Sequence, residues 1–258
     1  GVHLGHKKII NTLKHYAIKH AEPSAILTFW PHPRMVLKIE EHKLRFLNTM
    51  EEKKQLLQQE DVDNLIIHPF TKDFGNYSSE QFVREVLVKQ LHVRHLVVGY
   101  NHHFGKNRLG DFNQLQLLAS KYHFQVSRVN PVDIDDIHIS STKIRNNLLK
   151  GNLELANRYL GYDYFLTGKV VEGSKIGRSL GFPTANIAAP DYKLLPKDGV
   201  YAIKIRSNGK MYSGMLNIGL KPTVNHQLKQ KKFIEAHIFG FNHSIYNQYV
   251  TVIFKKRL

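Results

Sequence analysis

Residues 168–187 read GKVVEGSKIGRSLGFPTANI. A β-branched strand is expected over 166–171, and the loop after it is rich in glycine, at Gly173, Gly177 and Gly181. Glycines at this density let backbone N–H groups approach a ligand, and turned backbone of this kind forms anion-binding nests. Lys175 and Arg178 add positive charge to the same loop. The pattern is typical of a phosphate-binding loop, and a Gly-rich connection without a ligand is the alternative.

Two polar side chains follow this loop. Thr184 and Asn186 place a hydroxyl and an amide oxygen two residues apart, so the two share one face of an extended segment. Hard oxygen ligands beside phosphate-binding glycines suit Mg²⁺ bound together with a nucleotide. The stretch by itself therefore indicates a site for a nucleotide and its Mg²⁺.

The same residues resemble the signature of riboflavin kinases, GxxxGRxLGFPTANI, which they match over positions 173–187. The resemblance implies a six-stranded antiparallel barrel of the flavokinase type. It also implies that Mg²⁺ binds at Thr184 and Asn186. The residues implied to bind ATP are Gly173, Lys175, Gly177, Arg178, Gly181, Thr184 and Asn186.

The composition limits the class of protein. With 258 residues, of which 42% are hydrophobic, the chain is long enough for one large or two ordinary domains with real cores. No run of about 18 apolar residues predicts a transmembrane helix, and no signal-peptide pattern is visible at the N-terminus. The sequence contains no cysteine, which excludes disulfides, thiolate metal sites and a cysteine nucleophile. A cytoplasmic protein is the expectation.

The charge balance raises a second class of function. The 37 Lys and Arg residues against 21 Asp and Glu residues give a net charge of +16, which favours a polyanionic partner. The basic residues are scattered, however, and the densest run, at 229–232, is short. Polyphosphate substrates also suit a basic surface, so no nucleic acid is expected. A basic nucleic-acid-binding protein remains the alternative, and it predicts steeply salt-dependent binding to DNA or RNA.

The N-terminal half alternates short apolar strands with amphipathic helices. Capping boxes at Thr49/Glu52 and Ser78/Gln81 mark the starts of two of the helices. Such alternation predicts a doubly wound parallel sheet. The expected strands cover 25–29, 64–69, 96–99 and 124–129.

A second motif opens the chain. Residues 1–6 read GVHLGH and lead into an apolar-periodic helix, whose N-terminus favours phosphate. The motif resembles the HxGH of nucleotidylyltransferases, and in particular the adenylyltransferase module of bacterial FAD synthetases. The resemblance implies that His3 and His6 stabilise charge in the transition state and that Gly1 and Gly5 contact the nucleotide. In that family a strand precedes the motif, so the first strand of the sheet is expected to be missing here.

Three further segments resemble the same module. Residues 30–34, WPHPR, look like its TFxPHP loop, and a rigid connection is the alternative. In the loop after residue 99, Asn101 keeps a polar group that would bind nucleotide, while His102 stands where an aromatic residue is usual. Residues 139–145 match ISSTxIR, and alone the hydroxyl residues would indicate ordinary helix capping. In family order with GVHLGH they are implied to hold the leaving phosphates of ATP: Ser140, Ser141, Thr142 and Arg145.

Beyond residue 161 the pattern changes to alternating strands, with a hairpin turn signal at Asn208-Gly209. Two domains are therefore predicted, 1–161 for adenylyl transfer and 162–258 for riboflavin phosphorylation. Within FIEAHIF, the residues Phe233, Glu235 and His237 share one face of a strand. A surface carboxylate is the bland interpretation, but the flavokinase resemblance implies that Glu235 is the catalytic base.

A loop of the form NIGxxPT is implied to contact the flavin, through Asn217, Gly219, Pro222 and Thr223. The family's C-terminal helices are missing after Arg257-Leu258, and weaker flavin binding is expected if the protein ends there. The complete resemblance implies FAD biosynthesis: riboflavin is phosphorylated by ATP to FMN, and FMN is adenylylated to FAD with release of pyrophosphate. Retention of only one of the two activities is a narrower alternative.

Overall fold

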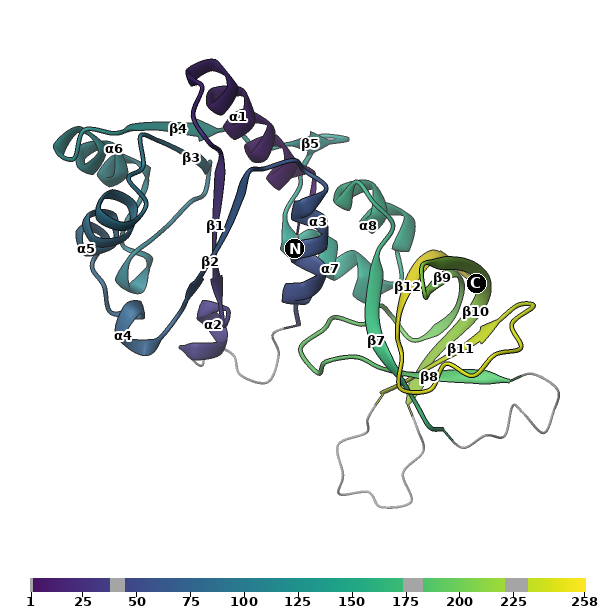
Figure 1. Cartoon of the computed structure of the whole chain (residues 1–258). Helices are drawn as coiled ribbons and strands as arrows, with labels where there is room; N and C mark the ends of the chain where they lie inside the picture. Colours follow the sequence, from purple (N-terminus) through teal and green to yellow (C-terminus); the bar gives the residue numbers. More distant parts are fainter. Residues whose placement is uncertain (1, 38–44, 174–182, 221–231) are drawn as a thin grey trace. The chain divides into compact units, whose positions relative to one another are not determined.

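The computed structural model describes residues 2–37, 45–173, 183–220 and 232–258 (Figure 1). By its internal contacts the chain divides into two compact units. One consists of Val2–Leu44 and Lys54–Ile139, and the other of Gly1, Arg45–Lys53 and Ser140–Leu258. Each unit is described by itself below.

The first unit contains the parallel strands that the alternation predicted. Strands β1 (Ala25–Trp30) and β2 (Asn64–Pro69) pair in parallel, from Ala25 opposite Asn64 to Trp30 opposite Pro69. Strands β3 (His95–Gly99) and β4 (Gln125–Val129) form a second parallel pair. The strands thus form two separate pairs within the described residues. Parallel pairing brings the carboxyl ends of β1 and β2 to one edge, where ligands bind in open α/β sheets.

The helices of this unit begin where the sequence predicted, because their caps are local. Helix α1 (Leu4–His20) begins inside the first motif, directly after His3, and α6 (Phe112–Lys121) is capped by Asp111. The shorter elements are α2 (Pro33–Val36), α3 (Met50–Gln58), whose residues up to Lys53 belong to the other unit, α4 (Lys72–Gly75), α5 (Ser79–Phe82) with π-helical turns over Val83–Gln90, a 3₁₀ turn at Lys106–Arg108, and the β5 (Asp133–Ile134) and β6 (Ile137–His138) hairpin.

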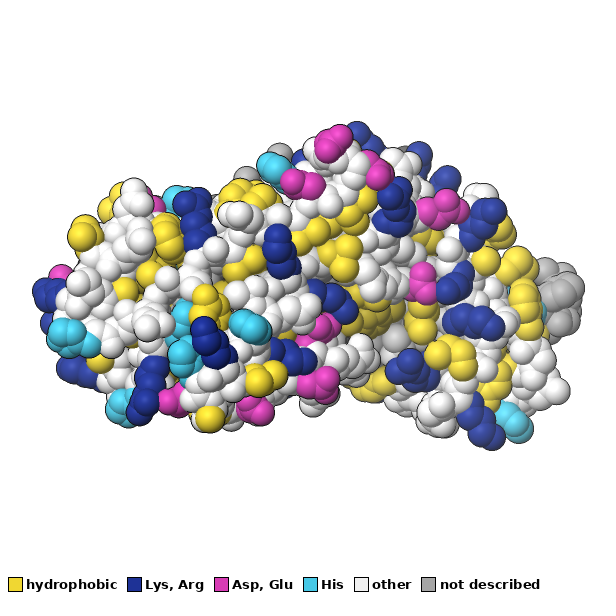
Figure 2. Space-filling model, turned by 90° about the horizontal axis from the view of Figure 1, so that it is seen from above, with side chains coloured by type: hydrophobic (Ala, Val, Ile, Leu, Met, Phe, Trp, Pro, Cys, Tyr) yellow, Lys and Arg dark blue, Asp and Glu magenta, His cyan; other side chains and the backbone are white. Residues whose placement is uncertain are grey.

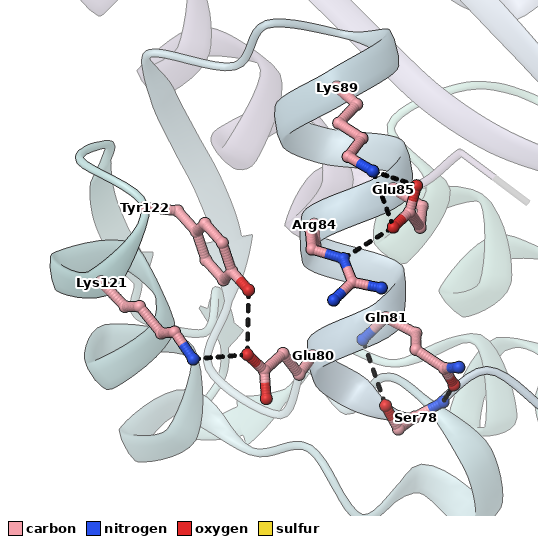
Figure 3. A network of polar contacts seen from close by, with 8 residues as sticks. All are labelled: Ser78, Glu80, Gln81, Arg84, Glu85, Lys89, Lys121 and Tyr122. Carbon is pink, nitrogen blue, oxygen red and sulfur yellow. Dashed lines mark hydrogen bonds and ion pairs between the residues drawn. The ribbon is translucent and has the colours of Figure 1, made fainter.

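A polar network joins α5 to α6 (Figure 3). The Glu80 carboxylate accepts bonds from Lys121 Nζ at 2.7 Å and from the Tyr122 hydroxyl at 2.9 Å. At the start of α5, Ser78 and Gln81 form the predicted capping box. Beneath these contacts, buried side chains of the π-helical turns, β3 and α6 form one apolar core, with Val83, Leu87, Val98 and Leu115 among its members. This core fixes the carboxyl end of β3 and the loop that follows it.

The second unit opens with two helices, α7 (Ser141–Lys150) and α8 (Leu153–Leu160). Both end at a glycine in the left-handed region, Gly151 at φ 90° and Gly161 at φ 76°. Only glycine adopts this conformation without strain, so these residues stop the helices where the sequence predicted. Helix α8 buries Ala156 and Leu160 on one face and packs against the last strand of the barrel.

The six remaining strands form the predicted closed antiparallel barrel, in the order β10-β11-β8-β7-β12-β9. Alternate residues such as Leu166, Ile205 and Ala236 are buried, as the period of two requires. Between β9 and β10, Asn208 and Gly209 have φ of 47° and 77°, the positive values of the predicted hairpin turn. The strands are β7 (Phe165–Val171), β8 (Thr184–Ala188), β9 (Gly199–Ser207), β10 (Lys210–Leu220), β11 (Lys232–Ile238) and β12 (Tyr249–Arg257).

The surface shows how the positive charge is distributed. On the face drawn in Figure 2, Lys and Arg side chains are spread out and Asp and Glu side chains lie among them. Among the described helices, none is both long and apolar enough to span a bilayer.

Candidate active sites

One candidate site lies on the outer face of the barrel, over the neighbouring strands β8, β11 and β10. In β8, Ala185 and Ile187 are buried in the barrel, so Thr184 and Asn186 point outward. In β11, alternate residues are buried in the same way, and Glu235 points outward with Phe233 and His237. The shared faces predicted from the period of two are therefore confirmed.

Glu235 lies at the centre of this face. Its Oε1 accepts a hydrogen bond of 2.6 Å from the Thr184 hydroxyl. In the strand register, Glu235 lies opposite Asn186 on one side and opposite Asn217 on the other. His237 Nδ1 lies 2.9 Å from the carbonyl oxygen of Pro183. Because a carbonyl oxygen only accepts, that nitrogen carries the proton.

Two glycines bring backbone close to this face. A Cβ atom on Gly173 would lie 2.0 Å from Asn186 Nδ2, so the chain entering the glycine-rich loop passes directly over that amide. A Cβ atom on Gly219 would lie 2.8 Å from Cε1 of Phe233, so the phenyl ring covers this glycine. In both places a larger residue would displace a side chain of the site.

The outer face has the donor atoms that a divalent cation bound with a nucleotide requires. Thr184 and Asn186 supply hydroxyl and amide oxygens, which are hard ligands, and the Glu235 carboxylate lies beside them. No group of three or more His, Asp or Glu side chains within the described residues could hold a metal alone. A cation here would therefore share its coordination with nucleotide phosphates, and these oxygens fit that arrangement.

A second candidate site lies at the start of α1. His3 precedes the helix in an extended conformation, at φ −144° and ψ 172°, and its side chain makes no capping hydrogen bond. The residue is 7% exposed, and its buried Nδ1 has no hydrogen-bond partner. Burial lowers the pKa of His3 to about 4, so the imidazole is neutral at pH 7. An unpartnered buried nitrogen at a helix N-terminus is suited to a ligand.

The remaining residues of the HxGH motif complete this site. The exposed ring of His6 lies 4.0 Å from that of His3, measured between centroids. A Cβ atom on Gly5 would lie 3.0 Å from Cε1 of His3. The glycine of the motif thus leaves room for the His3 ring beside the first turn of α1.

The loop after β3 is held against α5. Asn101 is exposed, and the ring of His102 stacks on Phe104 at 5.8 Å with an interplanar angle of 17°. A histidine at this place thus keeps an aromatic contact. Cβ atoms on Gly105 and Gly110 would each lie 2.6 Å from the Ser79 hydroxyl oxygen, which shows how closely the loop approaches the helix.

Sequence reasoning did not recognise the aromatic cluster at the carboxyl ends of β1 and β2. Phe74 lies 5.5 Å from Phe29 and 4.5 Å from His68 between ring centroids, and Phe70 lies 5.5 Å from Phe74. These rings come from two strands and from α4, so no single sequence window contains them. The available signal was the aromatic residue at the carboxyl end of each strand, Phe29 inside β1 and Phe70 directly after β2.

The ISSTKIR residues lie in the second unit. Ser140 caps α7, because its Oγ accepts a hydrogen bond from Lys143 N–H at 3.3 Å. This hydroxyl therefore acts as the ordinary helix cap that was the alternative from the sequence. Ser141 and Thr142 are in the first turn, and Arg145 Nε donates to Arg45 O at 3.0 Å. The other predicted site residues lie outside the described parts of the chain: Gly1, Lys175, Gly177, Arg178, Gly181, Pro222 and Thr223.

Comparison with known proteins agrees with the motifs. The family model described as FAD synthetase matches residues 1–143, and the one described as riboflavin kinase matches residues 160–258. A bifunctional riboflavin kinase/FMN adenylyltransferase from Listeria monocytogenes is 39% identical, over 96% of this chain and 78% of the relative. The protein of the same description from Bacillus subtilis is 35% identical, over 100% of this chain and 81% of the relative.

A solved structure has the same fold. The crystal structure titled as a macrolide-efflux protein from Streptococcus pneumoniae matches with a TM-score of 0.87 and 27% identity, over 99% of this chain and 82% of that one. Its title describes that protein, whereas both family models and the curated relatives agree on the two enzyme domains. The chain belongs to the family of bifunctional riboflavin kinase/FMN adenylyltransferases.

Proposed function

We propose that the barrel phosphorylates riboflavin and that the α/β part adenylylates the resulting FMN, with the motif residues named above in the active roles. The observation that supports the kinase assignment most directly is the hydrogen bond between Thr184 and Glu235 on a face shared with Asn186. A carboxylate that accepts a hydrogen bond from a hydroxyl in this place is suited to take the proton of a substrate hydroxyl.

In the kinase step, the 5′-hydroxyl oxygen of riboflavin attacks the γ-phosphorus of ATP. The bond from that phosphorus to the β–γ bridging oxygen breaks, the hydroxyl proton passes to Glu235, and ADP leaves. Thr184 and Asn186 would hold Mg²⁺, which would neutralise phosphate charge. Such transfers depend mainly on positioning. The glycine-rich loop from Gly173 contacts the phosphates, and Asn217 and Gly219 lie on the flavin side of Glu235.

In the adenylyl step, a phosphate oxygen of FMN attacks the α-phosphorus of a second ATP. The bond to the α–β bridging oxygen breaks, and pyrophosphate leaves without a covalent enzyme intermediate. His3 donates a hydrogen bond as a neutral imidazole, and His6 adds a second donor for the developing charge. Ser140, Ser141, Thr142 and Arg145 bind the leaving phosphates, while Asn101 contacts the nucleotide.

The proposal assigns residues 1–161 to adenylyl transfer and residues 162–258 to the kinase reaction. Because both reactions consume ATP and the chain has no cysteine, we place the protein in the cytoplasm. On the face drawn in Figure 2, the scattered charge gives no specific support to a nucleic-acid partner.

One assay tests both steps. The protein is incubated with riboflavin, ATP and Mg²⁺, and FMN and FAD are separated by chromatography. The proposal expects FMN to appear first and FAD to follow, and FMN supplied alone with ATP should also yield FAD. Accumulation of FMN without FAD would restrict the function to the kinase, and turnover of FMN only would restrict it to adenylyl transfer.

A further inference from the structure

The segment 45–53 belongs to one part of the chain by sequence and to the other by its contacts. It lies within the residues matched by the FAD synthetase model, yet by its contacts it belongs to the unit that contains the barrel. Phe46 N–H donates to Tyr192 O at 2.7 Å, and Leu194 N–H donates to Phe46 O at 2.8 Å. The backbone of this segment is therefore hydrogen bonded to the chain that leaves β8.

A fully buried ion pair extends this connection. Lys193 Nζ lies 2.6 Å from Glu52 Oε2, and both side chains are 0% exposed. The ammonium group also donates to Leu47 O at 2.6 Å and to Phe165 O at 2.7 Å, so all three of its donors are used. The other carboxylate oxygen, Glu52 Oε1, accepts from Thr167 N–H at 2.7 Å.

The side chains of this ion pair bond to backbone groups of β7 that are not paired with β8. Strands β7 and β8 pair only over three positions, from Lys169 opposite Ala188 to Val171 opposite Asn186. On its other side, β7 pairs with β12. Thr167 N–H and Phe165 O lie beyond the paired region, and Glu52 and Lys193 bond to them there. Without these side chains the two backbone groups would lose these hydrogen bonds.

The two strands held in this way carry the proposed kinase site. Strand β7 runs from the pair toward Gly173, and β8 carries Thr184 and Asn186. Burial lowers the pKa of Lys193 to about 8, although Glu52 acts in the opposite direction. A buried ion pair is weak evidence for stability, because apolar side chains of similar volume often stabilise as well or better. Apolar side chains, however, could not form the directional hydrogen bonds that Glu52 and Lys193 make to the backbone.

We propose that Glu52 and Lys193 are positioning residues for the riboflavin kinase reaction, so that a segment of the FAD synthetase half sets the geometry of the kinase site. This inference rests on the assignment of the kinase reaction to the barrel. A displacement of about 1 Å at a reacting group reduces turnover by roughly 10²-fold, so a modest opening of β7 from β8 is sufficient to be measured.

The test uses Lys193→Met and Glu52→Gln in the full chain, at a temperature where the variants are folded. Misplacement of Thr184 and Asn186 should raise the KM for ATP in FMN formation, and kcat/KM should fall by roughly tenfold or more. FAD formation from supplied FMN should change much less. Lys255→Met is the matched control, because it removes an exposed barrel ion pair with Asp163 at 2.5 Å and should leave the kinase unchanged.

Melting temperature separates positioning from stability alone. A variant with a lower melting temperature but wild-type kinase constants per folded molecule would overturn the inference. In Glu52→Leu/Lys193→Met, an apolar pair removes the unpaired charge. If the two residues are positioning residues, the KM for ATP of this double variant stays high even where its melting temperature recovers. Recovery of both the KM and the melting temperature would also overturn the inference. If Lys193→Met is unfolded at the assay temperature, the milder Glu52→Gln decides. Wild-type protein that makes no FMN would instead reject the proposed function.

Discussion

At the scale of single residues, the two candidate sites use their polar groups differently. Glu235 lies on a half-exposed strand face and already accepts a hydroxyl hydrogen bond. His3 is buried, with a ring nitrogen that has no partner. The proposed mechanism uses the first group to take a proton from a substrate and the second to donate a hydrogen bond to one.

Glu235→Gln tests the first of these roles. Glutamine keeps the shape of the side chain and can still bond to Thr184, but it does not accept a proton at neutral pH. Loss of a general base costs about 10²–10⁴-fold, so kcat for FMN formation should fall by that order. ATP binding and FAD formation from FMN should persist. A folded variant with near-wild-type FMN production would remove Glu235 from the mechanism, and a lower melting temperature with normal turnover would make it structural.

His3 gives a prediction for the pH dependence of stability. Its pKa is about 4 in the folded chain and 6.5 in the reference state, so between these values the unfolded chain binds more protons. Its contribution to the free energy of unfolding is therefore present above pH 6.5 and is lost as the pH falls toward 4. The difference of 2.5 pKa units corresponds to at most about 3 kcal/mol.

His3→Gln removes this titration. Urea unfolding at pH 7 and at pH 4.5 should show that the wild-type chain loses more stability than the variant on acidification. The exposed His103→Gln serves as the control and should follow the wild-type chain. If all three proteins lose the same amount, His3 does not have a depressed pKa.

At the scale of elements, the entry to the glycine-rich loop depends on a close approach between β7 and β8. A methyl group on Gly173 would lie 2.0 Å from the Asn186 amide, and Gly173 follows shortly after Val171, where the pairing of β7 with β8 ends. The requirement for glycine is thus steric, since the side chain of Asn186 occupies the space that a Cβ needs.

Gly173→Ala should therefore damage the kinase site selectively. The variant must move either the loop or Asn186, so we expect the KM for ATP in FMN formation to rise by roughly tenfold or more. FAD formation from FMN should not change. Val171→Ala, which alters an exposed side chain two residues earlier, is the control. Equal kinase constants for the two variants would show that Asn186 does not need its present position.

At the scale of the whole molecule, the contacts do not follow the division at residue 161 that the sequence pattern predicts. Lys193 of the barrel is neutralised by Glu52, which lies 141 residues earlier in the chain. The assignment of the two activities to 1–161 and 162–258 stays a prediction. A fragment that begins at residue 162 contains the lysine and lacks its carboxylate.

This arrangement predicts that Lys193→Met has opposite effects in two contexts. In the full chain it leaves Glu52 buried without a partner, and the free energy of unfolding should fall by about 3–5 kcal/mol. In fragment 162–258 it removes a lysine whose carboxylate partner is missing, so the melting temperature should rise. Thermal unfolding of all four proteins measures this. A destabilised variant fragment would show that the lysine finds another partner within the barrel.

Contacts between near neighbours could be predicted from the sequence. The capping boxes at Thr49/Glu52 and Ser78/Gln81 and the turn at Asn208-Gly209 appear as expected, because each is closed by residues at most three positions apart. The strands of the barrel were likewise visible in the alternation of buried and exposed side chains. The family was evident from motifs that are contiguous in the chain.

The same Glu52 shows where such reasoning ended. Its role as a helix cap was predicted, but its bonds to Thr167 and Lys193 were not, since these residues lie 115 and 141 positions away. The Thr184–Glu235 bond spans 51 positions. The sequence by itself determined the local elements, the barrel pattern and the family, because short-range hydrogen bonds and side-chain periodicity are written in neighbouring residues. Only the tertiary structure decided which polar groups meet, because closing the barrel brings distant strands together and burial then requires every charge between them to be paired.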